Sequence, residues 1–149
     1  MINKTILVVD DRRFDRQFLS KALKNKIGCA IVEAGSAQEA LKALLSGSID
    51  MVISDVEMPD VSVEQLVVEI RRTHPPERLP IIMVSGKLHD SIIIQCIKSG
   101  ANDYITKPVN VEVAMARILS HLRLSDAIAD RARAQELAAP KCHDRLLQS

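Results

Sequence analysis

Aromatic residues are scarce in this chain of 149 residues: together they make up 2% of it, and tryptophan is absent. This scarcity nearly rules out the stacking of bases on aromatic rings as a mode of binding. The formal net charge is only +1, so the chain also lacks the basic excess of a nucleic-acid binder. We therefore expect no direct nucleic-acid partner. We also expect a core of aliphatic side chains, since 47% of the residues are hydrophobic.

Long apolar runs are missing as well, and none reaches the ~20 residues that a membrane-spanning helix needs. The first apolar run, Ile6–Val9, is too short for the core of a signal peptide, and two aspartates follow it directly. We therefore expect a cytoplasmic protein with no membrane partner. The three cysteines are far apart without a Cys-x-x-Cys pair, which favours buried or tail thiols over a disulfide or metal site. The four histidines are interpreted as surface or tail residues.

Short β-branched runs alternate with segments of helical spacing along the chain. The expected strands are Thr5–Val9, Ala30–Ala34, Met51–Ser54, Ile81–Val84 and Tyr104–Thr106. The expected helices are Phe14–Lys26, Ser36–Ser46, Val63–Thr73, Ser91–Ser99 and a long helix from Asn110. This alternation predicts an α/β fold in which a doubly wound, five-stranded parallel sheet carries five helices on its two faces. Sites in such sheets form at the carboxyl ends of the strands.

Chemically active side chains gather where the expected strands end. Asp10 and Asp11 follow the first strand, Asp55 the third, Ser85 the fourth and Lys107 the fifth. Each is an ordinary turn or cap residue when taken singly, but their order at successive strand ends favours a common site. Three close carboxylates repel one another, and a hard divalent cation such as Mg²⁺, which also prefers phosphate oxygens, removes that cost. An aspartate can accept a phosphoryl group as a nucleophile, with the lysine and the hydroxyl binding the phosphoryl oxygens.

Four motifs then point to a family. They are Val8–Asp11, Ser54–Asp60, Val84–Gly86 and Gly100–Pro108. Together they resemble the receiver domains of bacterial response regulators, over about Asn3 to Leu124. The resemblance implies a flavodoxin-like fold and a phosphorylation-dependent signalling switch that uses Mg²⁺. It also implies a histidine kinase or histidine phosphotransfer protein as phosphoryl source, and a downstream protein or output domain as partner.

The resemblance implies a role for each site residue. Asp55 matches the phosphoacceptor, and the metal ligands would be Asp10, Asp11, Asp55 and the backbone carbonyl of Glu57. Ser85 and Lys107 match the groups that bind the phosphoryl oxygens, and Tyr104 matches the aromatic residue that turns inward when the hydroxyl moves. Pro108 stands where the family often has a cis Lys-Pro bond.

Two departures from the family pattern bear on function. Glu57 and Lys87 each stand two residues after a site residue and carry opposite charges. They are expected either to pair and tune the lifetime of the phosphorylated state, or to be solvated loop charges. Val63 replaces a frequent glycine, and a β-branched residue tolerates positive φ poorly, so we expect a different turn after Pro59 or an early helix start.

The expected helix Ser91–Ser99 carries more apolar residues than one face can bury. Ile94 and Ile97 have core spacing, so Ile92 or Ile93 should be partly exposed. The exposed apolar patch would be a candidate partner surface beside the fifth strand. Extra contact with the next helix is an equally weighted alternative.

The last helix is expected to outlast the domain, which divides the chain into a receiver domain, 1–124, and an extension, 125–149. The helix should continue to about Ala138 and end at Pro140, with a disordered tail at 141–149. A weak heptad pattern suggests a homodimer through this helix. The ~25 residues of the extension cannot form an output domain. The chain is therefore either a single-domain regulator or the receiver part of a longer protein.

Two rival functions remain beside the switch, which would not be an enzyme beyond its own phosphorylation and dephosphorylation. A phosphohydrolase could use the same groups, but such enzymes carry Asp-x-Asp after the first strand, which Asp10-Asp11 does not match. They also need a substrate cap that this short chain lacks. A docking module that never turns over would require a broken acidic set, and here the set is complete. Catalytic turnover of an external phosphoester would favour the phosphohydrolase, and its absence would favour the switch.

Overall fold

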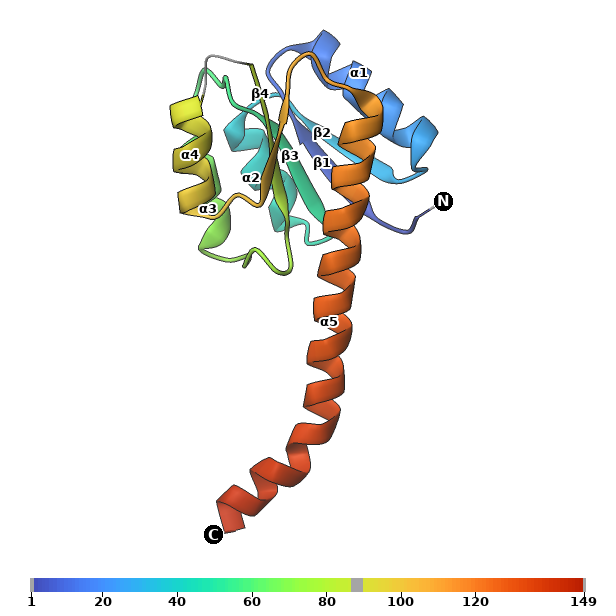
Figure 1. Cartoon of the computed structure of the whole chain (residues 1–149). Coiled ribbons are helices and arrows are strands. Elements are labelled where there is room, and N and C mark those ends of the chain that lie inside the picture. Colours follow the sequence, from blue (N-terminus) through green and yellow to red (C-terminus); the bar gives the residue numbers. More distant parts are fainter. Residues whose placement is uncertain (1, 87–89, 149) are drawn as a thin grey trace.

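The computed structural model describes residues 2–86 and 90–148, and their side chains as far as residue 138. Helices and strands alternate through the chain (Figure 1). The elements are β1 (Thr5–Val9), α1 (Arg13–Lys26), β2 (Ala30–Ala34), α2 (Ala37–Leu45), β3 (Met51–Asp55), α3 (Val63–Arg71), β4 (Ile81–Ser85), α4 (Asp90–Ser99), β5 (Asp103–Thr106) and α5 (Val111–Gln148). Each expected element is present, and the predicted bounds differ from these by a few residues at most, except at the end of α5.

All the strands run parallel in one sheet, in the order β2-β1-β3-β4-β5. Helices α1 and α5 cover one face, and α2, α3 and α4 cover the other (Figure 1). Each face has its own buried cluster because side chains alternate along a strand: Val52 packs with the α2–α3–α4 side, and Ile53 with the α1–α5 side. The predicted doubly wound, flavodoxin-like α/β fold is confirmed.

Helix α3 begins directly after the β3–α3 loop. Ser62 caps it, with its Oγ accepting from the Gln65 amide at 3.2 Å, and Val63 is its first residue and is buried. Positive φ values in the described part of the chain occur only at glycines. Val63 therefore avoids backbone strain because the helix takes it up, which is the early start expected as one alternative.

Helix α4 buries a different face from the one predicted. Ile93 and Cys96 are its buried residues, whereas Ile94 is 52% and Ile97 41% exposed. The expectation that Ile94 and Ile97 face the core is wrong, and the expected partial exposure of Ile92 is confirmed at 37%. Apolar residues fill so much of this helix that its periodicity left the rotation about its axis undetermined.

Helix α5 extends well beyond the sheet (Figure 1). Its backbone continues past Pro140, so the predicted helix end at that proline is wrong. The side chains of the predicted tail, 141–149, lie outside the described residues. Contacts with the body reach Asp126, whose Oδ1 lies 2.6 Å from Lys4 Nζ, and Ser125, whose Oγ donates to the Glu77 carbonyl at 2.8 Å. Among the described residues, no helix is long and apolar enough to cross a membrane.

Candidate functional site

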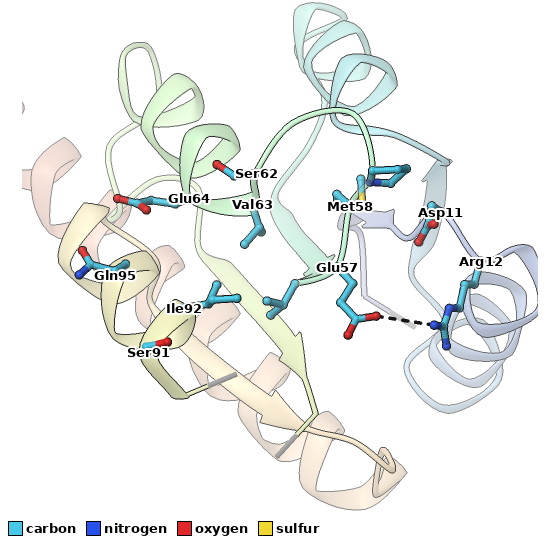
Figure 2. A pocket seen from close by; sticks show the side chains of 12 residues that line it. Asp11, Arg12, Glu57, Met58, Ser62, Val63, Glu64, Ser91, Ile92 and Gln95 are labelled. Carbon is cyan, nitrogen blue, oxygen red and sulfur yellow. Dashed lines mark ion pairs between the residues drawn. The ribbon is translucent and has the colours of Figure 1, made fainter. Parts of the chain in front are cut away.

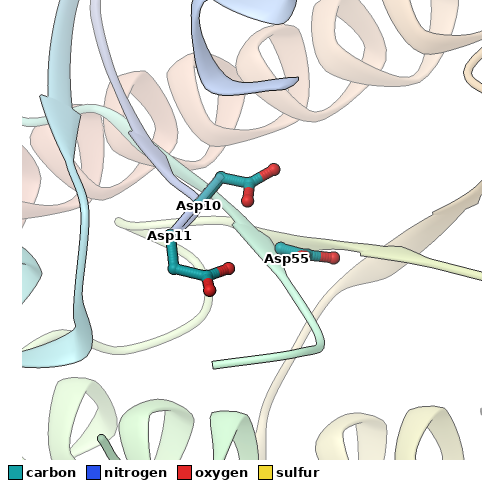
Figure 3. A group of neighbouring side chains, drawn as sticks. All are labelled: Asp10, Asp11 and Asp55. Atoms are coloured by element: carbon teal, nitrogen blue, oxygen red, sulfur yellow. The ribbon is translucent and has the colours of Figure 1, made fainter. Parts of the chain in front are cut away.

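Three aspartates meet at the carboxyl edge of the sheet. Figure 3 shows Asp10 and Asp11 at the end of β1 and Asp55 at the end of β3. One carboxylate oxygen from each lies within 4.8 Å of the others. Neighbouring strands place them there because β1 and β3 pair directly in register. Asp10 and Asp55 are buried, and Asp11 is exposed, so the cluster is open to solvent on one side.

Only one of the two Asp55 carboxylate oxygens has protein partners. Its Oδ1 accepts from the Val56 amide at 2.9 Å and lies 3.0 Å from Lys107 Nζ. Its Oδ2 is buried and has no hydrogen-bond partner. Buried polar atoms are usually satisfied, and a lone one at a site needs an explanation. An acidic cluster with an unpartnered carboxylate oxygen suits a hard divalent cation that takes oxygen ligands.

The charges in this cluster perturb one another. Burial raises the pKa of the Asp10 carboxyl to about 6, against the hydrogen bond from the Arg12 amide, and the neighbouring Asp55 adds to the rise. Burial lowers the pKa of Lys107, but the hydrogen bond to Asp55 and the negative charges of Asp55, Asp10 and Asp15 together outweigh it, and the pKa lies above its ordinary value. The lysine therefore stays charged and offsets part of the repulsion between the carboxylates.

The ends of β4 and β5 complete the edge. Ser85 is fully buried, and its Oγ donates to the Gly86 carbonyl at 2.9 Å. The Lys107 amide donates to the Ser85 carbonyl at 2.7 Å, which ties the two strand ends together. The Lys107–Pro108 peptide bond is cis, as the family resemblance implied.

A pocket of about 630 Å³ opens beside the cluster, between the β1–α1 loop, the β3–α3 loop and the start of α4. Figure 2 shows Glu57 and Arg12 facing each other there, with Glu57 Oε2 3.6 Å from Arg12 Nη2. Both side chains are more than half exposed, so this ion pair contributes little stability. The expected partner of Glu57, Lys87, lies outside the described residues.

Tyr104 points outward on β5 with 39% of its surface exposed. The Arg117 guanidinium lies 5.8 Å from the centre of its ring, within range of a cation–π contact. Arg117 Nη1 also donates to Asp103 Oδ1 at 2.7 Å, and His121 Nε2 lies 3.0 Å from Asp103 Oδ2. Burial raises the pKa of Asp103, but the contacts with His121, the Tyr104 amide and Arg117 outweigh it and hold the pKa below its ordinary value.

The family model that describes the response regulator receiver domain matches residues 6–119. The chain belongs to this family. Two curated relatives show the range of its members. The phosphate regulon transcriptional regulatory protein PhoB of Pseudomonas aeruginosa is 33% identical over 123 residues, which cover 83% of this chain and 53% of PhoB. The two-component response regulator ORR8 of Oryza sativa subsp. indica is 35% identical over 124 residues, covering 82% of this chain and 100% of ORR8.

A solved structure agrees with the assignment. The CheY-like response regulator receiver domain protein of Methanospirillum hungatei JF-1 superposes with a TM-score of 0.78 at 25% identity, covering 85% of this chain and 98% of that one. This chain is thus a receiver domain homologous to response regulators of two-component systems. It spans about half the length of PhoB and the whole of ORR8.

Sequence reasoning missed three residues that lie around Glu57 and Tyr104 in this receiver domain. Arg12 pairs with Glu57, and Arg117 and His121 hold Asp103 beside Tyr104. The interpretation of every histidine as a surface or tail residue is wrong for His121, which is largely buried against Asp103. The i, i+4 spacing of Arg117 and His121 on one helix face was the available signal. It could not name their partner on another element.

Proposed function

We propose that this receiver domain is a phosphorylation-dependent signalling switch in which Asp55 accepts a phosphoryl group from a histidine kinase or a histidine phosphotransfer protein. The observation that carries the proposal is the buried Oδ2 of Asp55, which has no hydrogen-bond partner while Oδ1 is engaged by Lys107 and the Val56 amide. One oxygen of the carboxylate is thus anchored, and the other is left for chemistry.

The transfer is a displacement at phosphorus. An Asp55 oxygen forms the new P–O bond as the P–N bond of the donor phosphohistidine breaks, and the leaving imidazole nitrogen keeps the electron pair. Such reactions need positioning and charge neutralisation more than covalent help from the protein. Lys107, whose ammonium already lies 3.0 Å from Asp55, is placed to bind a phosphoryl oxygen, and the Ser85 hydroxyl would turn from the Gly86 carbonyl toward another.

We propose Mg²⁺ as the cation of this site. Asp10, Asp11, Asp55 and the backbone carbonyl of Glu57 would hold it, and the acidic cluster and the unpartnered Asp55 oxygen support this assignment. The cation would supply charge neutralisation for the phosphoryl oxygens.

We propose that phosphorylation changes the surface formed by α4, β5 and α5. Movement of the Ser85 hydroxyl leaves room for Tyr104 to turn inward, and the exposed Ile92, Ile94 and Ile97 supply an apolar patch on the same side. A downstream protein or an output domain of a longer chain would read this surface. Glu57 is proposed, with Lys87, to set the lifetime of the aspartyl phosphate.

We also propose the division of the chain into a receiver domain, 1–124, and an extension, 125–149, through whose helix two copies can associate. The function is not that of an enzyme acting on external substrates. The proposed setting is the cytoplasm, where histidine kinases present their phosphoryl groups.

The test is the intact mass of the protein after incubation with acetyl phosphate and Mg²⁺. We expect one acid-labile phosphoryl adduct in the wild type, none in Asp55→Ala, and none in the wild type when Mg²⁺ is chelated. Glu136→Gln, an exposed acid-to-amide change on the extension, should behave like the wild type. An adduct that survives in Asp55→Ala would refute the assignment, and steady release of phosphate from an external phosphoester would favour a phosphohydrolase.

A further inference from the structure

The β3–α3 loop, residues 56–62, is tied to a helix that precedes β3 in the sequence. Asp60 Oδ1 accepts from the Ala37 amide at 3.3 Å, and Asp60 Oδ2 accepts from the Gln38 amide at 3.2 Å. These amides belong to the first turn of α2, where backbone N–H groups have no partner within the helix. The carboxylate thus bridges the loop and the N-terminus of α2.

The α2 terminus is capped from its own sequence too. Ser36 Oγ accepts from the Glu39 amide at 3.1 Å, and the Glu39 carboxylate accepts from the Gly35 amide at 2.7 Å. The Ala37 and Gln38 amides, which these local caps do not bind, donate to Asp60. Burial raises the pKa of Asp60, but the hydrogen bonds from the Gln38 and Ala37 amides, together with those from the Asp60 and Val61 amides, outweigh it, and the pKa lies below its ordinary value. The ionised form is the one that binds, as expected at a positive helix terminus.

The rest of the loop is fixed on its inner side. The Val56 amide donates to the Val84 carbonyl at 3.0 Å, and Met58 and Val61 pack against the buried cluster under α2 and α3. Glu57 lies exposed between these anchors. Asp60 holds the outer side of the loop on the α2 amides, and Glu57 contributes an exposed ion pair with Arg12 at 3.6 Å. An exposed pair of this kind is weak, so loss of Asp60 would let the segment around Glu57 shift while the apolar anchors stay in place.

We propose that Asp60 is a positioning residue for the metal site: by holding the loop on the α2 terminus, it keeps the backbone carbonyl of Glu57 where it completes the Asp10–Asp11–Asp55 cluster. This inference rests on the proposed Mg²⁺ site. Asp60 itself binds no metal and takes no part in phosphoryl transfer. Its effect is on cation affinity, through a loop that α2 keeps in position.

A purely structural role for Asp60 would be to cap α2. The two roles separate because α2 has a second cap, Ser36, that does not touch the loop. Ser36→Ala and Asp60→Ala both remove acceptors from the same helix terminus, and both should lower stability by similar amounts. Asp60→Ala alone frees the loop. Asp60→Asn keeps an acceptor oxygen on the loop and serves as the conservative variant.

The experiment is calorimetric titration of the full chain with MgCl₂ without any phosphodonor, with urea unfolding of each variant as the measure of stability. We expect Asp60→Ala to weaken Mg²⁺ binding about fivefold, the factor that corresponds to the loss of a typical capping interaction. Ser36→Ala should bind as the wild type does, and Asp60→Asn should lie between. If Asp60→Ala does not fold, Asp60→Asn measured against Ser36→Ala decides the question.

The outcomes separate this inference from the function on which it rests. A wild type that binds no Mg²⁺ would refute the proposed cation site itself. A wild type that binds, with the Asp60 variants binding as tightly as Ser36→Ala, would leave that site standing and overturn the role of Asp60. Equal weakening in Ser36→Ala and Asp60→Ala would assign the effect to α2 stability and overturn it as well.

Discussion

Lys107 Nζ lies 3.0 Å from Asp55 Oδ1, and this ion pair joins the ends of β5 and β3 across the end of β4. The lysine supplies the positive charge next to two buried carboxylates, Asp10 and Asp55. Removal of one partner from such a pair is more costly than the pair is stabilising, because the remaining charge stays buried without compensation.

We therefore expect Lys107→Ala to lower the free energy of unfolding by about 2 kcal/mol without metal. The loss should shrink when MgCl₂ is added, because a bound cation would take over the compensation. Urea unfolding at pH 7.5 measures both values. Lys21→Ala, which removes an exposed lysine from α1, is the control and should change stability by less than about 0.5 kcal/mol. Equal stability of the two variants would contradict the expectation.

The raised pKa of Asp10 gives the metal-free protein a defined pH dependence. The folded-state pKa of about 6 lies above the unfolded value of about 3.9, so the folded state binds more protons between them. Stability should fall as pH rises through that window. Asp10→Asn removes the charge and keeps an oxygen for the Arg12 amide, which Asp10 Oδ1 accepts at 2.9 Å.

In a chelating buffer at pH 7.5, Asp10→Asn should therefore be more stable than the wild type, with a free energy of unfolding higher by roughly 2 kcal/mol. Urea unfolding measures this difference. At pH 4 the difference should nearly vanish, because the wild-type carboxyl is then protonated in the folded state. An equal difference in unfolding free energy between Asp10→Asn and the wild type at both pH values would show that the carboxylate charge is not the cause.

Tyr104 is the only tyrosine, and tryptophan is absent, so intrinsic fluorescence excited at the usual wavelengths reports on this one switch residue. We expect quenching by acrylamide to weaken when acetyl phosphate and Mg²⁺ are added, because the ring, now 39% exposed, would turn inward. Asp55→Ala should show no change. Quenching that is unaltered in a wild type shown by mass to be phosphorylated would remove Tyr104 from the switch.

The Arg117 guanidinium lies over that ring, 5.8 Å from its centre. We expect Arg117→Ala to strengthen acrylamide quenching in the unphosphorylated protein and to lower stability by about 1 kcal/mol, since it also removes a partner of Asp103. Arg123→Ala, an exposed change six residues further along α5, should leave the quenching constant as it was. Parallel changes in both variants would trace the effect to α5 as a whole.

Two glycines with positive φ should differ in their tolerance of a side chain. Gly100 has φ +121°, and a Cβ there would lie 2.9 Å from Arg71 Cγ. Arg71 cannot easily move, because its guanidinium donates to the Gly100 and Leu79 carbonyls at 2.8 Å. Gly47 has φ +83° with nothing within 4 Å, so its substitution meets backbone strain alone.

We expect Gly47→Ala to cost about 1 kcal/mol and Gly100→Ala about 3 kcal/mol, because the second adds a clash to the strain. Denaturant midpoints of the two variants provide the comparison. Equal losses would show that Arg71 yields to the new methyl group.

The sequence predicted much of the candidate site because strand ends are local features. A buried strand reads as a β-branched run, and the residue that follows it is placed at the sheet edge by chain geometry alone. Asp10, Asp11 and Asp55 therefore came together as expected. The same reasoning failed on α4, where five of the ten residues are apolar and three of these are consecutive, so that they define no single hydrophobic face.

The sequence by itself determined the order of helices and strands, the parallel sheet and the acidic edge, because these follow from periodicity and from right-handed crossovers. Only the tertiary structure decided which distant groups meet there. Asp60 reaches the α2 amides, Arg12 reaches Glu57, and Arg117 reaches Tyr104. Each contact joins two elements whose relative placement is set by packing of the whole core, and no local pattern carries that information.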